Sequence, residues 1–250
     1  MSPKSPSFQA ILGVNFYIGK LPGLLDLCAD GHFIVVPAAP ALVDLTTDPH
    51  YREALEKSDL AITDSGFMVV LWRLLKRQGL PRISGLKLLR ALLATDAFKR
   101  SGSSFWIMPS APESAANLAW LQRNHYAVTE EFCYVAPIYP KGAITDLALL
   151  RLIESQRPHY VMVNIGGGTQ ERLGLYLKEN LSYRPSIICV GAAIAFLTGR
   201  QAAIPVWADT LMLGWLLRCL HAPAQFTPRI WKGLRLITIL AKYRERSVTS

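Results

Sequence analysis

The sequence predicts an α/β fold: a mostly parallel, Rossmann-like sheet covered by helices on both faces and followed by a C-terminal helical appendage. The first observation behind this prediction is that short apolar runs rich in β-branched residues alternate with longer segments of helical periodicity. The second is a hydrophobic content of 51% in 250 residues, which suffices for a sizeable core. The third is that the alternation stops after about Ala193. We therefore expect a core over residues 1–195 and an appendage over residues 196–250.

The individual elements follow from the same alternation. Apolar runs predict strands at residues 10–15, 33–36, 60–63, 104–108, 131–135, 159–164 and 187–190. Segments of helical period predict helices at residues 22–30, 41–57, 66–77, 86–98, 111–123, 144–156 and 170–180. Strands separated by helices form parallel sheets that are buried on both faces. Such sheets bind ligands beyond the carboxyl ends of their strands, so chemistry is expected in the turns that follow them.

Composition limits the compartment and the cofactors. No stretch without a formal charge is longer than that of residues 185–199, which is shorter than the roughly 20 apolar residues that a membrane span needs. The four cysteines lie far apart without a CxxC pair, which predicts reduced, mostly buried thiols in a cytoplasmic protein. No spacing resembles a metal site, so we expect neither a metal nor another cofactor.

Positive charge is concentrated at the C-terminal end. The net charge of the chain is +9, and residues 200–250 contribute eight basic side chains against two acidic ones. This asymmetry indicates an anionic partner for the appendage, such as phospholipid, a diphosphate or nucleic acid. Nucleic acid is the least favoured of these, because the chain has no recognised nucleic-acid-binding motif.

Two kinds of strand-end turn are candidates for a binding site. The predicted strand at residues 60–63 ends in Asp64, whose carboxylate either faces a substrate or caps the next helix. The strand at residues 159–164 runs into Gly166, Gly167 and Gly168, whose backbone N–H groups either surround a phosphate or form an ordinary turn. Gln170 and Glu171 follow this turn, and Gly191 lies in a third turn of small residues.

Short motifs along the chain carry, in their order and spacing, a family resemblance. They are Ile11-Leu12-Gly13-Val14, Asp64-Ser65-Gly66, Arg82-Ile83-Ser84-Gly85, Gly167-Gly168-Thr169-Gln170-Glu171, Val190-Gly191-Ala192, Phe196-Leu197-Thr198-Gly199 and Gly214-Trp215-Leu216-Leu217-Arg218. The series resembles the WecG/TagA/CpsF glycosyltransferase family over nearly the whole chain after residue 10. The second motif resembles that family's Ala-Asp-Gly and the fourth its G-x-P-x-Q-E pattern.

The resemblance implies a metal-independent, inverting transferase of cell-envelope or exopolysaccharide biosynthesis. Such enzymes take a UDP-linked sugar, often of the N-acetylmannosamine type, and a polyprenyl-diphosphate-linked saccharide as acceptor. It implies that Asp64 is the general base. The residues predicted to bind the donor are Gly66, Gly85, Gly166, Gly167, Gly168, Gln170, Glu171 and Gly191. Those predicted to meet the acceptor or a diphosphate are Arg200, Arg218 and Arg229.

The chain departs from the family pattern at several substrate-facing positions. The family's Thr-x-Asn corresponds to Pro37 and Ala39, its aspartate after the Arg-x-x-Gly stretch to Lys87, its Arg-Ala-Pro to residues 203–205, and the glutamate before its tryptophan to Gly214. These changes leave an alternative open: a catalytically divergent member that binds a nucleotide sugar or lipid diphosphate and acts in regulation or as a scaffold. Self-association also stays open.

The last helical segment is amphipathic. On a helical wheel over residues 229–246, the residues Ile230, Leu234, Ile237 and Ala241 share one face, and Lys232, Arg235, Lys242 and Arg246 lie roughly opposite. This pattern fits either a helix lying in an anionic membrane surface or a helix packed on the core with a solvated basic face. The first alternative predicts a cytoplasmic enzyme that is peripheral on the inner face of the cell membrane.

Overall fold

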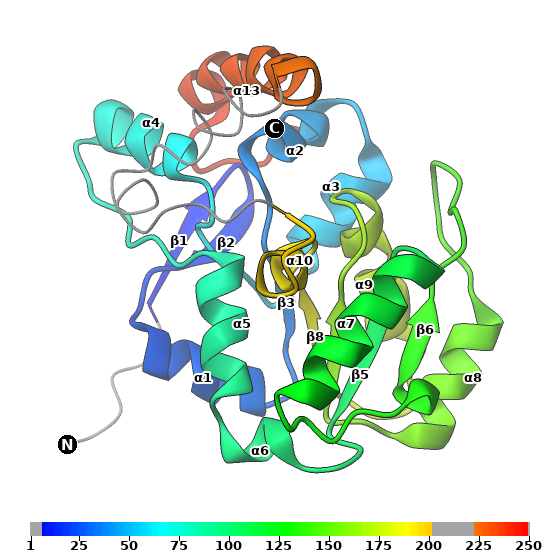
Figure 1. The fold of residues 1–250 in the computed structure, drawn as a ribbon. Coiled ribbons are helices and arrows are strands. Elements are labelled where there is room, and N and C mark those ends of the chain that lie inside the picture. Colours follow the sequence, from blue (N-terminus) through cyan, green and yellow to red (C-terminus); the bar gives the residue numbers. More distant parts are fainter. Residues whose placement is uncertain (1–6, 202–222, 250) are drawn as a thin grey trace.

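The computed structural model describes residues 7–201 and 223–249, and the side chains of the last helix from Trp231 onward. One sheet of eight strands forms its centre, in the order β1-β2-β4-β3-β8-β7-β5-β6. The strands are β1 (Phe8–Ile11), β2 (Val14–Tyr17), β3 (Phe33–Val35), β4 (Leu60–Ala61), β5 (Ser104–Met108), β6 (Cys133–Val135), β7 (Tyr160–Val163) and β8 (Ser186–Cys189). Every pairing from β2 to β6 across the sheet is parallel, which confirms the predicted fold class (Figure 1).

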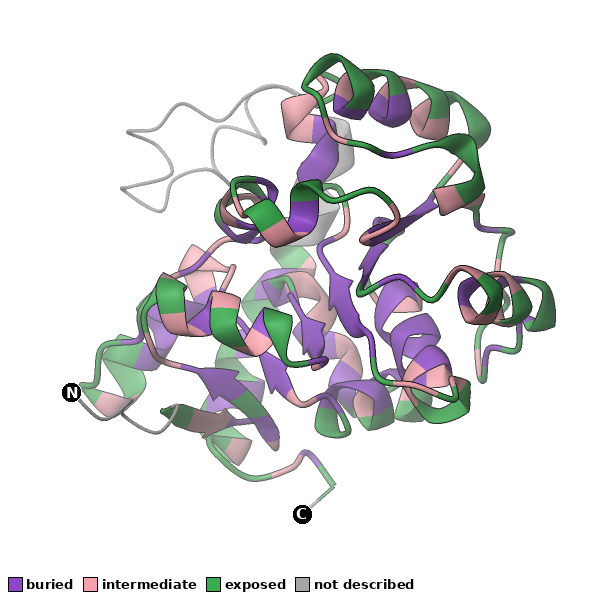
Figure 2. Ribbon diagram, turned by 90° about the horizontal axis from the view of Figure 1, so that it is seen from below, coloured by how far each residue is buried: buried purple, intermediate pink, exposed green. Residues whose placement is uncertain are grey.

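Helices cover both faces of this sheet. Along β3, Phe33 and Val35 pack into one core cluster and Ile34 into the other, as the alternation of side chains along a strand requires. The first cluster is closed by α2 (Ala39–Leu42), α3 (Pro49–Glu56), α4 (Gly66–Lys76), α8 (Leu147–Gln156), α9 (Thr169–Asn180) and α13 (Pro223–Tyr243). The second is closed by α1 (Leu21–Ala29), α5 (Gly85–Leu93), α6 (Asp96–Lys99), α7 (Ala111–Arg123) and α10 (Ala193–Leu197). Figure 2 shows the strands as the buried layer between these helices.

The N-terminal prediction of a single strand over residues 10–15 is wrong. The chain forms a hairpin instead, in which β1 and β2 pair antiparallel. Leu12 and Gly13 have positive φ angles of 55° and 80°, and this pair of left-handed residues reverses the chain. The turn is held by the C-terminal end of the protein, because the amides of Leu12 and Gly13 donate to the carbonyls of Arg244 and Glu245.

Three other predicted elements are divided. Residues 41–57 form α2, the 3₁₀ turn η1 (Val43–Thr46) and α3, because Asp48 caps a new helix whose first residue is Pro49. Residues 86–98 divide into α5 and α6, since Thr95 caps the second helix. Residues 131–135 begin as the 3₁₀ turn η2 (Glu130–Phe132) and become β6 only at Cys133.

The last helix packs on the core. Leu236 and Leu240 of α13 are fully buried, and the helix lies against α2, η1 and α4. Lys232 forms an ion pair with Asp44 of η1 at 2.6 Å. This is the core-packed arrangement that the amphipathic pattern allowed, although Leu234 and Ile237 on the predicted apolar face remain exposed. Among the described helices, none combines the length and the apolar character needed to cross a bilayer.

The described cysteines are free thiols. Cys28 and Cys189 are buried and Cys133 is partly buried; Cys219 lies outside the described residues. Burial raises the pKa of Cys28 to about 12 and that of Cys133 to about 11. Burial therefore favours the protonated form of both thiols at neutral pH.

Candidate functional site

The corner between β4 and α4 holds Asp64 without using it as a helix cap. Ser65 is the N-cap of α4, and its hydroxyl accepts the amide of Met68 at 3.2 Å. Asp64 Oδ1 instead accepts the amide of Gly85, the first residue of α5, at 3.0 Å. A negative charge is favoured at this position, because the N-terminus of a helix carries partial positive charge. The structure therefore turns the carboxylate of Asp64 toward the N-terminus of α5 rather than toward its own helix.

Arg82 supports the same corner from the loop before α5. Its Nε donates to the backbone carbonyl of Asp64 at 2.8 Å, which fixes the peptide that carries the carboxylate. Ser84 caps α5 by accepting the amide of Lys87 at 3.2 Å. The segment Arg82–Gly85, one of the motifs of the sequence, thus contributes side-chain and backbone groups that hold Asp64 in place.

Gly85 connects this corner to the end of β8. A Cβ atom built at Gly85 would lie 3.3 Å from Val36 Cγ1 and 3.7 Å from the carbonyl oxygen of Val190. The α5 N-terminus is therefore seated over β3 and β8, the two strands that follow β4 in the order of the sheet. Asp64 and Gly191, which are separated by more than a hundred residues, belong to one continuous strand-end surface as a result.

The glycine turn after β7 exposes its backbone. A Cβ atom built at Gly166, Gly167 or Gly168 would meet no other atom within 4 Å, so open space lies beside all three residues. Gly168 has a φ of 87° and precedes the first residue of α9. The turn thus presents unhindered main chain at a helix N-terminus, an arrangement that suits an anion.

Gln170 and Glu171 are buried beneath this turn. Glu171 Oε2 accepts the amide of Gly168 at 2.6 Å, and Oε1 accepts Gln170 Nε2 at 2.9 Å. Burial raises the pKa of Glu171 above its ordinary value, although its hydrogen bonds act in the opposite direction. Within the described structure, Gln170 Oε1 has no hydrogen-bond partner, and a Cβ atom built at Gly191 would lie 3.5 Å from it. Glu171 therefore braces the turn, and Gln170 lies directly below Gly191.

A pocket of about 260 Å³ opens next to Gly191. Asn164, which directly follows β7, lines it together with Asn117 and Glu113 of α7 and Arg200. The side-chain oxygens of Asn117 and Asn164 are buried and have no hydrogen-bond partner in the described structure. Arg200 Nε lies 3.5 Å from Glu113 Oε1, which holds the guanidinium at the pocket. Buried polar atoms without partners are rare in folded proteins, so their presence beside a pocket indicates a place for a polar ligand.

Most of the residues predicted from the sequence meet at this edge of the sheet. Asp64, Gly66, Gly85, the three turn glycines, Gln170, Glu171, Gly191 and Arg200 all lie at or next to strand ends. Arg218 lies outside the described residues, as do residues 203–205 and Gly214, and Arg229 lies in α13 with an undescribed side chain. Lys87 is an exposed residue of α5, whereas Pro37 is buried just beyond β3.

Sequence analysis missed Asn117, Asn164 and Glu113. Asn164 carried a readable signal, because it is a polar residue that directly follows a fully buried strand. Asn117 and Glu113 gave no such signal, since only the packing of α7 against β5 and β6 brings them to the pocket. Among the described residues, no group of three or more His, Cys, Asp or Glu side chains is arranged to hold a metal ion.

Comparison with known proteins gives one finding. A family model described as Glycosyl transferase WecG/TagA/CpsF family matches residues 9–249. A search of curated proteins finds no significant match. The family match covers the sheet, the strand-end site and α13.

Proposed function

Since the chain belongs to the WecG/TagA/CpsF family of glycosyltransferases, we propose that it moves a hexose from a UDP-sugar to a polyprenyl-diphosphate-linked saccharide, with inversion at the transferred carbon. The observation that carries this proposal is the placement of Asp64. Its carboxylate lies at the same sheet edge as an exposed glycine turn, held by the N-terminus of another helix. The same edge of the sheet thus offers a base for the acceptor hydroxyl and an anion-binding surface for the departing diphosphate.

The proposed reaction is a single displacement. The acceptor hydroxyl attacks the anomeric carbon of the donor, the bond from that carbon to the UDP oxygen breaks, and the hydroxyl proton passes to Asp64. UDP leaves with the bonding electron pair. A positioned base at the attacking hydroxyl contributes typically about 10²–10⁴-fold to such a rate. N–H groups aimed at the departing diphosphate stabilise the charge that develops there.

The donor is proposed to lie across the ends of β8 and β7. Gly166, Gly167 and Gly168 offer main-chain N–H groups to the diphosphate, and Gly191 permits a close approach above Gln170. β4 and β7 are separated by three strand spacings, about 14 Å at the usual distance between strands. This span leaves room for an extended ligand with its sugar toward Asp64. The backbone and Arg200 are proposed to replace a metal ion at the diphosphate.

The acceptor is proposed to approach from a membrane surface. Its polyprenyl tail cannot leave a bilayer, so the enzyme must work where the soluble donor and the lipid meet. The basic C-terminal segment, with Arg218 and Arg229, is proposed to bring the protein to that surface and to contact a diphosphate, since a guanidinium fork suits phosphate oxygens. The site of action would then be the cytoplasmic face of the cell membrane, and the product a precursor of an envelope or extracellular polysaccharide.

A second candidate function is favoured by the end of β3. Pro37 and Ala39 are buried next to the strand-end surface and have no side-chain hydrogen-bond donor. A member without the usual contacts there would bind a nucleotide sugar or a lipid diphosphate and act as a regulator or scaffold. The two candidates share the binding site and differ in turnover.

The test is a ligand screen followed by a transfer assay. Nucleotide sugars are screened for thermal stabilisation of the full chain, because a ligand that binds only the folded state raises its stability. The stabilising donors are then incubated with polyprenyl-diphosphate-linked saccharides, and the anomeric configuration of the product is measured by NMR. Transfer with inversion supports the first candidate, and stabilisation without transfer supports the second. If no UDP-sugar stabilises the protein, the donor assignment of both candidates is overturned.

A further inference from the structure

Exposed apolar side chains are concentrated on two helices. Ten large hydrophobic residues of the described structure are exposed, and six of them belong to α4 and α13: Val70, Leu74, Leu75, Trp231, Leu234 and Ile237. Leu74 and Trp231 are the extremes on these helices, with 73% and 68% of their surface exposed. We call these six residues the α4–α13 face.

Core packing does not account for this face. The inward side of α4 is already supplied by Met68, Leu71 and Trp72, and that of α13 by Leu236 and Leu240, all of which are buried. The outward residues Val70, Arg73 and Leu74 of α4 recur at helical spacing, and the exposed C-cap residue Arg77 follows them. An outward stripe that mixes apolar and cationic side chains is typical of helices that lie in a membrane interface.

The two helices form one surface rather than two. α4 packs against α13, and both lie at the end of the molecule beyond the strand ends (Figure 1). Lys76 in the last turn of α4 forms an ion pair at 2.7 Å with Glu245, just after α13. Glu245 carries the only acidic side chain in residues 66–77 and 231–249, so this contact neutralises the one negative charge of the region.

The charge of the region selects the partner. Eight cationic residues lie in residues 66–77 and 231–249: Arg73, Lys76, Arg77, Lys232, Arg235, Lys242, Arg244 and Arg246. In a symmetric dimer through this face the cationic groups of both copies would oppose one another, which disfavours a second copy. An anionic phospholipid surface offers apolar chains to the six hydrophobic residues and phosphates to the cations.

We propose that the α4–α13 face docks on an anionic phospholipid bilayer and that α4, not the C-terminal segment alone, sets the height of the active site above it. This inference rests on the proposed function for the role of Asp64, and extends it to a helix outside the basic C-terminal segment. α4 begins at Gly66, directly after Asp64 and its capping neighbour Ser65. Eight residues of helical rise separate Gly66 from Leu74, about 12 Å. Docking of α4 thus fixes the carboxylate near the headgroup level, where a lipid-linked diphosphate lies.

Outward-facing substitutions in the full chain test this surface. Truncation is unsuitable, because it would remove Leu236 and Leu240 from the core. The first variant is Val70→Ser/Leu74→Ser. Its matched control is Val135→Ser/Leu147→Ser, which removes an equally exposed valine from β6 and a less exposed, though still exposed, leucine from α8. Cosedimentation is measured at low salt with vesicles of phosphatidylcholine containing phosphatidylglycerol, and with phosphatidylcholine alone. Melting temperatures and size-exclusion profiles without lipid accompany each measurement.

We expect the α4 variant to bind the anionic vesicles about tenfold or more weakly than the wild type, since burial of two aliphatic side chains is lost. The control should bind as the wild type does. Arg73→Gln/Arg77→Gln should weaken binding about fivefold per arginine and reduce its dependence on salt. Wild-type binding by a folded α4 variant would overturn the inference. So would a change from dimer to monomer with unchanged vesicle binding, which would identify a second copy as the partner.

Vesicle binding is measured without any sugar substrate, so the inference and the proposed function fail separately. Loss of transfer with normal, α4-dependent vesicle binding would contradict only the proposed function. If transfer to a soluble acceptor analogue is normal and the α4 variant binds vesicles as the wild type does, only the inference is contradicted.

Discussion

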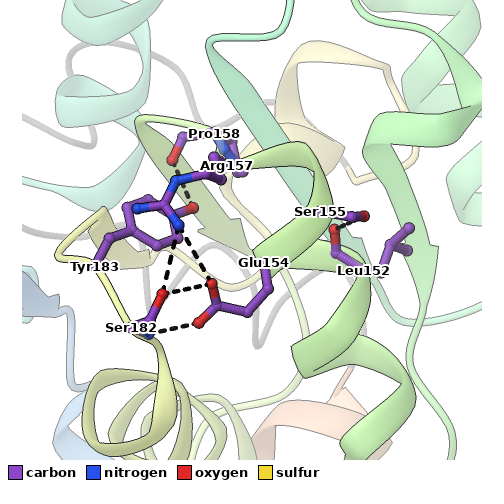
Figure 3. A network of polar contacts seen from close by, with 7 residues as sticks. All are labelled: Leu152, Glu154, Ser155, Arg157, Pro158, Ser182 and Tyr183. Atoms are coloured by element: carbon purple, nitrogen blue, oxygen red, sulfur yellow. Dashed lines mark hydrogen bonds and ion pairs between the residues drawn. The ribbon is translucent and has the colours of Figure 1, made fainter.

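Polar residues lie near both ends of β7 and β8, and the two ends differ in whether these residues find hydrogen-bond partners within the protein. At the amino ends, Glu154 accepts the amide and hydroxyl of Ser182 at 2.5 and 2.8 Å, and Arg157 lies over the ring of Tyr183 (Figure 3). The Tyr183 hydroxyl donates to the carbonyl of Pro158 at 2.9 Å. At the carboxyl ends, by contrast, the side-chain oxygens of Asn164 and Gln170 are buried without a hydrogen-bond partner in the described structure.

This difference distinguishes polar groups that stabilise the fold from polar groups that are available to a ligand. The amino-end network is complete within the protein and crosslinks the segments before β7 and β8, so nothing is gained there by a ligand. At the carboxyl end, buried acceptors lack partners, and each such group costs about 1–3 kcal/mol when it stays unsatisfied. A ligand that supplies the missing donors recovers part of that cost. Substitutions at the two ends should therefore differ in kind as well as in size.

The largest expected effect is at Asp64. Asp64→Asn keeps an oxygen that accepts the amide of Gly85, so the fold and donor binding should be retained. It removes the base, and turnover should fall by about 10²–10⁴-fold. Steady-state transfer rates measure this change, with thermal stabilisation by UDP as the check on binding. Asp96→Asn, which changes an exposed aspartate of α6, is the matched control. Wild-type turnover in folded Asp64→Asn would remove Asp64 from the catalytic role.

The next effect concerns the glycine turn. A side chain at Gly167 meets no atom of the protein within 4 Å, so Gly167→Val should fold normally while crowding any ligand at the turn. UDP at 100 times its Kd should stabilise the wild type by about 2.7 kcal/mol and the variant by much less. Gly79→Val, another exposed glycine with open space beside it, serves as the control. Equal stabilisation of all three proteins would place the diphosphate elsewhere.

The contribution of Glu171 to the free energy of unfolding should depend on pH. Because burial raises its pKa above 4.5, the folded state holds the proton more tightly than the unfolded chain. Its contribution to stability is thus largest below the unfolded pKa and is lost as the pH rises through the folded pKa. Glutamine does not ionise, so Glu171→Gln does not lose this stability. Its free energy of unfolding relative to the wild type should therefore rise as the pH increases from the unfolded to the folded pKa of Glu171. Urea denaturation from pH 4 to above neutrality measures it, and a constant difference would contradict burial as the dominant cause.

A smaller effect, on stability alone, is expected at the N-cap of α4. Ser65→Ala removes the acceptor for the amide of Met68, which should lower stability by about 1 kcal/mol. Asp64→Asn next to it should leave stability nearly unchanged, because Asp64 is not the cap. Melting temperatures of the two variants test this division of roles. A larger loss of stability in Asp64→Asn than in Ser65→Ala would reverse it.

Local sequence signals account for most of the fold. The predictions for residues 104–108 and 111–123 agree with β5 and α7 at both ends, because a continuous apolar run and a capped helix carry their own boundaries. The hairpin at the N-terminus was missed because Leu12, a residue that rarely adopts positive φ, does so here. Its conformation depends on hydrogen bonds to residues 244 and 245, which no local pattern contains.

The candidate site was predictable only in its strand-end parts. Asp64 and the turn glycines follow apolar runs directly, so their place at the carboxyl edge follows from the topology of a parallel sheet. One partner of the Asp64 carboxylate is the amide of Gly85, 21 residues away, and a main-chain amide cannot be recognised from the residue type. The pocket needs Asn117 and Asn164 side by side, which results from the packing of α7 rather than from any spacing.

The smallest effect is expected at the amino end, and it should have the opposite sign with pH. The amide and hydroxyl of Ser182 lower the pKa of Glu154, so its contribution to stability is present above the unfolded pKa and is lost as the pH falls through the folded pKa. Its side chain is 28% exposed, so solvent weakens the contact, and Glu154→Gln should cost less than about 1 kcal/mol at pH 7. The difference from the wild type should vanish in acid, whereas that of Glu171→Gln grows as the pH rises. Transfer activity should not change, because this network lies at the other end of the strands from Asp64. A Glu154→Gln protein with normal stability and reduced turnover would show that the two ends are coupled, and would break the separation drawn between them.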